Sequence, residues 1–216
     1  MRNAVYTMIL TVCLGTLSAQ IIQDEDALAL INTLEQKYNA YQSLEAQFKL
    51  TISIPEDEPI IRKGKVIQKG QDYFLNTESQ DVYSDGKSIW IHLKDDSEVQ
   101  INDVDEDDGS MMNLSPSGIL AMFNKNNYEY AIVKKEKSLN QIEFKPMETD
   151  SDISKIRIEV NVKSDELSNA TVFYKDGIRY HVDVTDVAAN EVYDDSIFKF
   201  DASKYPGIYV EDLRID

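Results

Sequence analysis

The sequence predicts a mainly β protein, an incomplete barrel of about eleven antiparallel strands with helices covering its concave apolar face. Strict alternation of apolar and polar residues over 46–54 and over 156–162 indicates strands with one buried face and one wet face. Asp-Gly pairs at 85–86 and 176–177, each between apolar runs, predict two type I′ hairpins. Two apolar helical segments are available to cover the inside of the curled sheet.

The N-terminus has the pattern of a cleaved secretory signal. Arg2 precedes an apolar stretch over 4–17, and the small residues that follow favour cleavage after Ala19. This stretch is too short to span a membrane as a helix. Cys13 is the one cysteine of the chain and lies inside the apolar stretch rather than at the cleavage point. We therefore expect no lipid anchor, and no disulfide or cysteine metal site in the mature chain.

Composition bounds the rest of the chain. Residues 1–19 are interpreted as the signal peptide and residues 20–216 as a single domain with a sizeable core. The formal net charge is −17, and removal of the signal with its arginine makes the mature chain more negative by one. Such a charge argues against nucleic acid and against attraction to anionic membrane surfaces, and it suits a soluble exported protein.

The first half of the mature chain reads as one helix followed by short strands. Apolar residues recur at three- and four-residue spacing over 24–44, which predicts a helix with one apolar face. Trp90, the one tryptophan, lies in a central strand, where it either packs in the core or lines an apolar cavity. The strands expected in this half cover 46–54, 61–68, 72–77, 82–83, 89–91 and 99–101.

An acidic stretch, NDVDEDDGSMM over 102–112, follows these strands. We tested it as a calcium loop that begins at Asp103. Position six of that loop is then Asp108, where glycine is needed, and position twelve is Leu114, where glutamate is needed. The stretch is therefore interpreted as a solvated loop without a metal.

A second helix is expected over 116–123, because serine caps a helix well and proline is favoured at its first position. Ile119, Leu120 and Phe123 make this short helix apolar on more than one side. Either it is a fixed plug in the core, or it is a movable lid over a cavity. We expect the lid, with the acidic stretch before it acting as a hinge.

Strands return in the second half of the chain. They are expected over 128–133, 141–146, 156–162, 170–174, 178–184 and 197–200, with a turn over 205–208 in the tail. No linker or internal repeat divides the sequence. Because several strands have one wet face, the sheet is expected to be antiparallel and curled around its apolar side.

Chemistry typical of enzymes is missing from the pattern. His92 and His181 are the only histidines, and both lie on expected strands with alternating neighbours, where surface or satisfied core positions are the usual finding. No glycine-rich phosphate loop, G-x-S-x-G elbow or H-E-x-x-H motif is present. We therefore predict a protein that is not an enzyme and that has no cofactor and no metal site.

Several short motifs, taken in order, carry a family likeness. The hairpin SDGKSIW is the most specific of them. The motifs are YQSLEAQF at 41–48, KGQDYFL at 69–75, SDGKSIW at 84–90, LSPSGIL at 114–120, F-x-F at 198–200 and YPGI at 205–208. Together they resemble the LolA family, the periplasmic carriers of outer-membrane lipoproteins, over essentially the whole mature chain.

The resemblance implies an incomplete antiparallel barrel, closed by helices, that holds lipoprotein acyl chains inside. The family often has an arginine that holds the helical lid closed, and Lys69 is its nearest match here, as a point charge rather than a planar fork. By register and by resemblance, the residues expected to line the acyl cavity are Phe48, Leu50, Tyr73, Leu75, Trp90, Ile119, Leu120, Phe123, Phe144, Ile156, Ile158 and Val160.

The same resemblance implies the surroundings of the protein. It would act as a periplasmic chaperone that takes acylated lipoproteins from an inner-membrane lipoprotein-releasing ABC transporter. It would carry them to an outer-membrane acceptor, which is a receptor lipoprotein or its equivalent. We expect a monomer that binds no nucleic acid.

Three alternatives remain open at this stage. The first is a carrier or sensor of other lipids on the same fold. The second is an enzyme, such as a hydrolase that uses carboxylates, which would need convergent polar groups inside the cavity. The third is a purely structural β protein with a solid core. An apolar cavity of several hundred Å3 would separate the binding proteins from the structural one.

Overall fold

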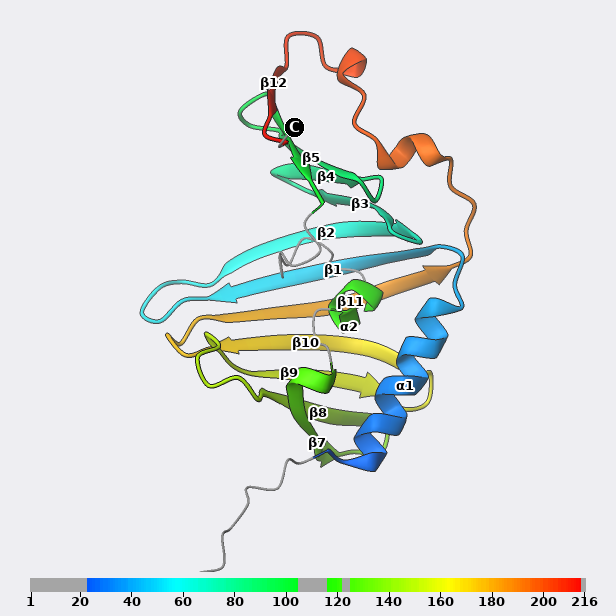
Figure 1. Ribbon diagram of the computed structural model, residues 1–216, viewed down its shortest axis with the longest axis vertical. Helices are drawn as coiled ribbons and strands as arrows, with labels where there is room; N and C mark the ends of the chain where they lie inside the picture. The colour runs from blue at the N-terminus through cyan, green and yellow to red at the C-terminus, as the bar shows by residue number, and fades with distance from the viewer. Residues whose placement is uncertain (1–22, 105–115, 122–124, 215–216) are drawn as a thin grey trace, which may run out of the picture.

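The computed structural model describes residues 23–104, 116–121 and 125–214, so the expected signal peptide and most of the acidic stretch lie outside the described residues. It confirms the predicted class, because twelve strands form one open, curled sheet and the longer helices lie on one side of it (Figure 1). The helices are α1 (Glu25–Asn39) and α2 (Pro116–Ala121). The strands are β1 (Leu44–Ser53), β2 (Ile60–Lys69), β3 (Asp72–Thr77), β4 (Gln80–Ser84), β5 (Ser88–Leu93), β6 (Glu98–Asp103), β7 (Tyr128–Lys135), β8 (Leu139–Pro146), β9 (Ile153–Asn161), β10 (Glu166–Tyr174), β11 (Arg179–Ala189) and β12 (Tyr209–Asp212).

The sheet is a meander with one long-range join in its middle. Its order is β12-β6-β5-β4-β3-β2-β1-β11-β10-β9-β8-β7, so β1 pairs with β11 and links the two halves of the chain. Every described pair of neighbours is antiparallel except β12 and β6, which run parallel. The prediction of about eleven antiparallel strands therefore missed the last strand and its direction.

The first helix is shorter than predicted. It begins after Asp24, whose side chain accepts hydrogen bonds from the backbone N–H groups of Asp26 and Ala27, and it ends at Asn39 rather than at residue 44. Leu44 instead starts β1, where it is buried and pairs with strands on both sides. Leucine suits both the helix period and the strand period, so the spacing alone did not place this boundary.

Both Asp-Gly hairpins are where the sequence predicted them, but neither is a type I′ turn. That turn needs positive φ at both central residues, and only the glycines have it, at 75° for Gly86 and 93° for Gly177. Each aspartate instead folds its carboxylate back onto the turn. Asp85 accepts from the N–H of Ser88 at 3.0 Å, and Asp176 accepts from the N–H of Ile178 at 2.9 Å.

The segment after β11 is not a strand over 197–200. It forms two short 3-10 helices, η2 (Asp195–Phe198) and η3 (Ala202–Lys204), before β12. Asp194 and Asp201 each cap the turn that follows by accepting a backbone hydrogen bond from a serine two residues later. These local side-chain hydrogen bonds favour a turn over a ladder, which explains why the apolar alternation was misleading.

This C-terminal segment covers the outer face of β3 to β6. Phe198 is fully buried, and Lys69 and Lys199 make ion pairs with Asp195 and Asp85 across the contact. An outer aromatic cluster lies beneath the segment, and its rings contact one another at centroid distances of 4.5 to 5.8 Å. Its members are Phe74, Tyr83, His92, Phe200 and Tyr205. This half of the sheet is therefore buried on both faces.

The two edges of the sheet are treated differently. At β7 the backbone of Gln23 adds a parallel bridge to Tyr130, and the Asp24 carboxylate accepts from the N–H of Ile132 at 3.2 Å. At the other edge, β12 is the outermost strand, with Tyr209 62% exposed and Val210 45% exposed. One edge is thus tied down by the start of the described chain, and the other is formed by its end.

Candidate functional site: the concave apolar face

The concave face of the sheet, beneath α1 and α2, is the candidate site. Apolar side chains from most strands form one continuous buried cluster there. On the helix side, α1 buries Ala27, Ile31, Leu34 and Tyr38 against it. The Tyr38 hydroxyl accepts a hydrogen bond of 2.9 Å from the backbone N–H of Leu167, which fixes α1 to β10. Burial raises the pKa of Tyr38 to about 12, so this hydroxyl stays neutral.

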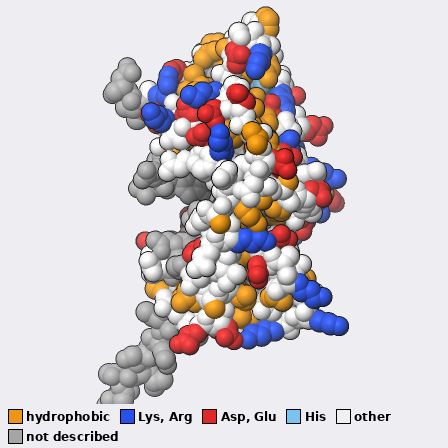
Figure 2. All heavy atoms as spheres, turned by 90° about the vertical axis from the view of Figure 1, so that its right-hand side faces the viewer, with side chains coloured by type: hydrophobic (Ala, Val, Ile, Leu, Met, Phe, Trp, Pro, Cys, Tyr) orange, Lys and Arg blue, Asp and Glu red, His pale blue; other side chains and the backbone are white. Residues whose placement is uncertain are grey.

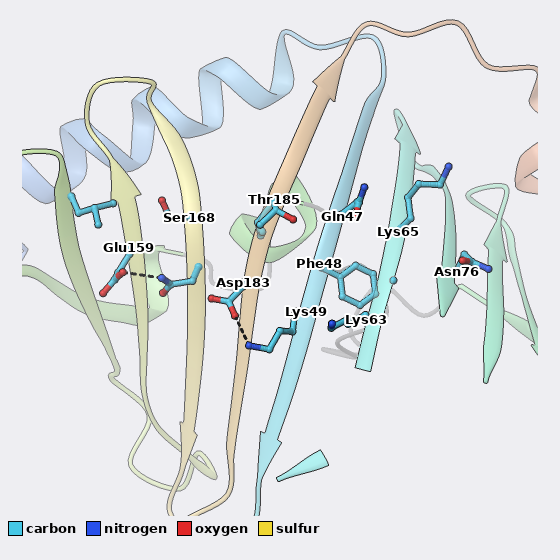
Figure 3. A pocket seen from close by; sticks show the side chains of 14 residues that line it. Gln47, Phe48, Lys49, Lys63, Lys65, Asn76, Glu159, Ser168, Asp183 and Thr185 are labelled. Carbon is cyan, nitrogen blue, oxygen red and sulfur yellow. Dashed lines mark hydrogen bonds and ion pairs between the residues drawn. The ribbon is translucent and has the colours of Figure 1, made fainter. Parts of the chain in front are cut away.

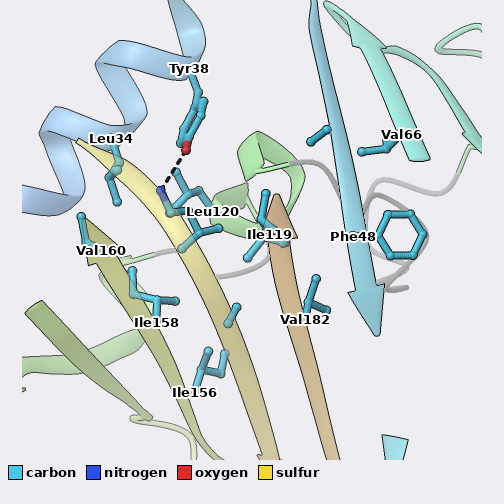
Figure 4. Packing of buried hydrophobic residues seen from close by; sticks show 14 of the residues in the cluster. Leu34, Tyr38, Phe48, Val66, Ile119, Leu120, Ile156, Ile158, Val160 and Val182 are labelled. Atoms are coloured by element: carbon cyan, nitrogen blue, oxygen red, sulfur yellow. Dashed lines mark hydrogen bonds between the residues drawn. The ribbon is translucent and has the colours of Figure 1, made fainter. Parts of the chain in front are cut away.

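The short helix α2 packs over the middle of the same face. Ile119 is 2% exposed and Leu120 is 6% exposed. Figure 4 shows both side chains between α1 and the strands, directed toward Ile158 and Val182. Phe123, the third apolar residue expected from this segment, lies outside the described residues. A six-residue helix has little surface of its own, so two buried aliphatic side chains tie it firmly to the sheet.

The strand residues expected to line the cavity gather on this face, with one exception. Leu50 is only half-buried and packs against the cluster near the hairpin end of β1. The fully placed members are Phe48, Tyr73, Leu75, Phe144, Ile156, Ile158 and Val160, each at most 8% exposed. They come from strands far apart in the sequence, and the curl of the sheet brings them around one apolar interior.

The exception is Trp90. Its neighbours Ile89 and Ile91 both contact the concave cluster, so Trp90 between them points to the opposite face. It is paired there with Tyr83, which belongs to the outer aromatic cluster. The expectation that Trp90 lines the cavity is therefore wrong. The run Ile-Trp-Ile is apolar on both faces of the strand. It has no alternation of apolar and polar residues, so the sequence could not show which residue points inward.

Lys69 also has a different role from the one expected of it. It lies on β2, next to Gln68, which shares a face with the buried Val66. Its amino group is 2.5 Å from the Asp195 carboxylate on η2, and this hydrogen bond raises the pKa of Lys69. The residue thus holds the C-terminal segment on the outer face, and it makes no lid contact with the described residues of α2.

Sequence reasoning missed part of the apolar lining. Leu167 lies before the strand predicted over 170–174, beyond a β-bulge. The other cluster residues of β10 and β11 alternate at positions that the predicted strands already covered. Had their period-two pattern been followed, it would have identified them. The missed residues are Leu167, Ala170, Val172, Val182 and Val184 on these two strands, together with Tyr130 and Ile142 on β7 and β8.

The concave face reaches solvent at the hairpin end of the strands. In Figure 1, α1 lies near one end of the strands, whereas the β1–β2 and β10–β11 hairpins lie at the other. A hollow of about 420 Å3 opens there, lined partly by Tyr174 and Tyr180, whose rings meet edge to face at 5.5 Å. Lys175 and Asp176 form its rim. Burial raises the pKa of Tyr174, which leaves a neutral, amphipathic ring at this end.

Polar groups that catalysis or metal binding needs are sparse on this face. In the described ranges, no group of three or more His, Cys, Asp or Glu side chains is close enough to hold a metal ion. Both histidines lie on the outer side of the sheet, where His181 contacts Thr171 and Asp183. None of the helices in the described part of the chain is long and apolar enough to cross a membrane. What the concave face offers a ligand is apolar contact.

Solved structures align with this chain at very low sequence identity. An uncharacterized conserved protein from Thermus thermophilus aligns with a TM-score of 0.56 and 7% identity, over 87% of this chain and 99% of that one. A DUF1329 family protein from Desulfovibrio piger aligns with a TM-score of 0.47 and 14% identity, over 85% of this chain and 100% of that one. A LolA superfamily protein from Nitrosomonas europaea aligns with a TM-score of 0.43 and 12% identity, over 81% of this chain and 97% of that one. The first of these supports the fold.

The family assignment comes from the sequence itself. No curated protein sequence matches this chain. The family model described as outer membrane lipoprotein carrier protein LolA matches residues 39–201, which run from the end of α1 to the start of η3. The match covers about three quarters of the chain, including strands β1 to β11 and the helix α2. The chain therefore belongs to the LolA family.

Proposed function

We propose that this protein is a periplasmic carrier that holds the acyl chains of lipoproteins against its concave apolar face and takes them from the inner to the outer membrane. The observation that carries the proposal is the buried apolar cluster on the concave face, in which α2 packs Ile119 and Leu120 among the strand residues. Membership in a family described as lipoprotein carriers supports it. The proposed activity is binding without chemical conversion.

The energetics explain why such a carrier has an enclosed face. An acyl chain has about fifteen methylenes, and each costs about 0.8 kcal/mol to expose to water. One chain therefore costs roughly 12 kcal/mol in an aqueous compartment, which prevents free diffusion between membranes. An apolar interior covered by helices removes that cost during transit. Acyl chains that replace the contacts of α2 would enter with little net change, since one apolar contact substitutes for another.

The proposal includes an order of events and a set of partners. Residues 1–19 are proposed to be a signal peptide that directs the chain to the periplasm, and residues 20–216 to be a single lipid-binding domain. An inner-membrane lipoprotein-releasing ABC transporter would load the cargo, and an outer-membrane acceptor would receive it. The hollow beside Tyr174 and Tyr180 is the proposed entrance, because the apolar face meets solvent there and α1 covers the opposite end.

Photolabelling tests the proposal directly. The mature protein is incubated with a lipoprotein whose acyl chain carries a diazirine, illuminated, digested and mapped by mass spectrometry. We expect labels on concave residues such as Ile119, Phe144 and Ile158. No label is expected on Lys49 or Lys63, whose side chains line the other face of the sheet. Labelling of the outer face, or none above the level of a carrier-free control, would overturn the proposal.

A matched pair of variants supplies a second test. Ile158→Gln places an amide in the apolar interior, whereas Glu159→Gln changes the next residue of β9, which faces outward. We expect the first to lose acyl-probe binding and the second to retain it. Ile156→Gln, on the same face of β9, is the reserve variant if Ile158→Gln does not fold by circular dichroism. Equal binding by all of the folded variants would contradict the assignment.

A further inference from the structure

The outer face of the sheet is hollowed on the side away from the helices. A groove of about 810 Å3 runs there across strands β3, β2, β1, β11, β10, β9 and the start of β8. Figure 3 shows it with α1 and α2 behind the sheet and the polar side chains of β1, β2 and β11 directed into it. The acyl face described above is on the other side of the same strands. Phe48 and Val184 of the concave cluster also border the groove, but its polar lining is a separate surface, which the cargo proposal leaves unexplained.

Three lysines, Lys49, Lys63 and Lys65, line one side of this outer groove. Lys49 is 3.4 Å from the Asp183 carboxylate, and Lys65 is 3.5 Å from the Glu45 carboxylate. Both separations exceed the 2.7–2.9 Å typical of a tight charged hydrogen bond, and all four side chains are partly exposed. Lys63 has no ion pair or hydrogen bond with its side chain among the described residues. These ammonium groups are loosely held and accessible.

The carboxylates in the groove are more tightly engaged than the lysines. Glu159 accepts hydrogen bonds from the side-chain amides of Gln141 at 2.9 Å and Asn169 at 2.8 Å, both of which are neutral donors. Asp183 is 3.1 Å from Nε2 of His181. Because side-chain amides already engage Glu159 and His181 contacts Asp183, the lysines present the accessible charge in the groove.

Cations also gather at the hairpin end of the same face. The ring of Phe173 on β10 lies under Lys155, Arg157 and Arg179, at 5.3, 5.3 and 5.6 Å from its centroid. Lys155 and Arg157 share the carboxylate of Glu143, whereas Arg179 has no ion pair in the described part of the chain. These three cations and the three groove lysines thus lie on the strip of sheet from β2 to β9, in a chain whose formal net charge is −17.

The shape and the neutral lining of the groove indicate which anion fits. A bilayer would contact only protruding groups, whereas a groove accepts an extended chain. The side chains of Gln47, Ser168 and Thr185 line it without hydrogen-bond partners among the described residues, so they offer amide and hydroxyl groups to a polypeptide backbone. In an extended strand, alternate side chains point to one face, so acidic residues at every second position would meet the lysines.

We propose that the outer groove, with Lys49, Lys63 and Lys65 along one side, docks an extended acidic polypeptide segment of a partner protein. The carboxylates of that segment lie over the three lysines, and its backbone bonds to the neutral lining. Because the ion pairs are exposed to solvent, the affinity is modest and falls as salt rises. The interaction is independent of the cargo, since it uses the opposite face of the sheet.

The test uses a short fluorescein-labelled peptide that alternates glutamate and serine, with a glutamine–serine peptide as the neutral control. Fluorescence anisotropy is measured with the mature protein at roughly 0.02 M and about 0.15 M ionic strength. The groove variant carries Lys49→Gln, Lys63→Gln and Lys65→Gln. A matched variant with Lys134→Gln, Lys137→Gln and Lys204→Gln loses the same charge elsewhere. We expect the groove variant to bind the acidic peptide about tenfold more weakly and the matched variant to bind it as the parent does.

Three outcomes would overturn the proposal. The acidic peptide does not bind above the neutral one; both triple variants weaken it equally; or the parent binds vesicles containing anionic lipid through the three lysines but does not bind the peptide. Binding of the acyl photoprobe is measured in parallel and is expected to be unchanged in the groove variant. Loss of acyl binding in the parent would therefore count against the carrier proposal alone.

Discussion

Gly64 lies where a core aromatic ring and the backbone of the neighbouring strand leave no room for a side chain. It lies on β2 opposite Phe48, and a Cβ built there would collide with the backbone oxygen of Asn76 and come within 2.6 Å of the Phe48 ring. The backbone oxygen belongs to the β2–β3 ladder and has no room to retreat. The glycine is thus needed for close packing of ring against backbone rather than for an unusual φ.

Gly64→Ala is accordingly expected to destabilise the protein by about 1–3 kcal/mol, which is typical of overpacking in a core. Urea unfolding followed by circular dichroism measures the change. Lys63→Ala, one residue away on the outer face, is the control and should shift the midpoint little. An unchanged midpoint for Gly64→Ala would mean that β2 separates from β3 easily at this point.

His92 gives the outer aromatic cluster a pH dependence. It is 6% exposed, it contacts the rings of Phe200 and Tyr205, and its Nδ1 has no hydrogen-bond partner among the described residues. Asp81 is 3.9 Å away but is already paired with Lys94 at 2.9 Å. Burial, with Lys94 nearby, holds the pKa of His92 below its usual value.

A lowered pKa in the folded state means that folding favours neutral His92. The stability it confers is complete above the unfolded pKa of about 6.5 and is lost as pH falls through the folded value. We expect the difference in unfolding free energy between the parent and His92→Phe to shrink or reverse on going from pH 7.5 to pH 5. Urea titrations of both proteins across that range measure it, and parallel curves would contradict the prediction.

At the scale of elements, α2 is either a movable lid or a fixed plug, and the two roles predict different effects of removing its buried side chains. Its two buried side chains occupy the space that acyl chains are proposed to take. If cargo displaces them, removing them should help binding while harming the empty fold. If α2 is a fixed wall of the site, both properties should suffer together.

The double variant Ile119→Ala, Leu120→Ala is expected to lose about 4 kcal/mol of unfolding free energy, at the low end for two buried aliphatic truncations, because a short helix can shift inward. The same variant should bind an acyl probe several-fold more tightly. Chemical unfolding and fluorescence titration measure the two effects separately. Weaker binding together with lower stability would favour the fixed plug.

The elements also show what the sequence could predict and what it could not. The alternation over 156–162 placed Ile156, Ile158 and Val160 on one face, because that face alone is apolar. The same logic failed for Trp90, because β5 is buried on both faces and its apolar run has no alternation with polar residues that would identify the inward face. The cover on its second face is the C-terminal segment, a long-range contact that no local pattern contains.

At the scale of the whole molecule, charge is spread unevenly. Figure 2 shows acidic and basic side chains interspersed on the side that carries α1, with hydrophobic side chains in small groups. Three lysines, Lys49, Lys63 and Lys65, line the outer groove. With a formal net charge of −17, long-range repulsion opposes the compact state at low ionic strength.

Added salt is therefore expected to stabilise the protein. The urea midpoint should rise between roughly 0.01 M and 0.2 M sodium chloride, as the Debye length falls from about 30 Å to below 10 Å. A neutral osmolyte at matched osmolality is the control for solvent effects. A midpoint that falls with salt would show that local ion pairs, such as Lys94 with Asp81, outweigh the net repulsion.

The order of the strands in the sheet has a consequence for how this protein folds during its synthesis. The outermost strand beside β6 is β12, which lies nearest the C-terminus among the described strands, so the ribosome makes it after the other eleven. Until it arrives, β6 presents an unpaired edge that can join a strand of another chain. Completion of the sheet is thus delayed until β12 has been made. A helper that shields this edge would have to act early and leave when the tail docks.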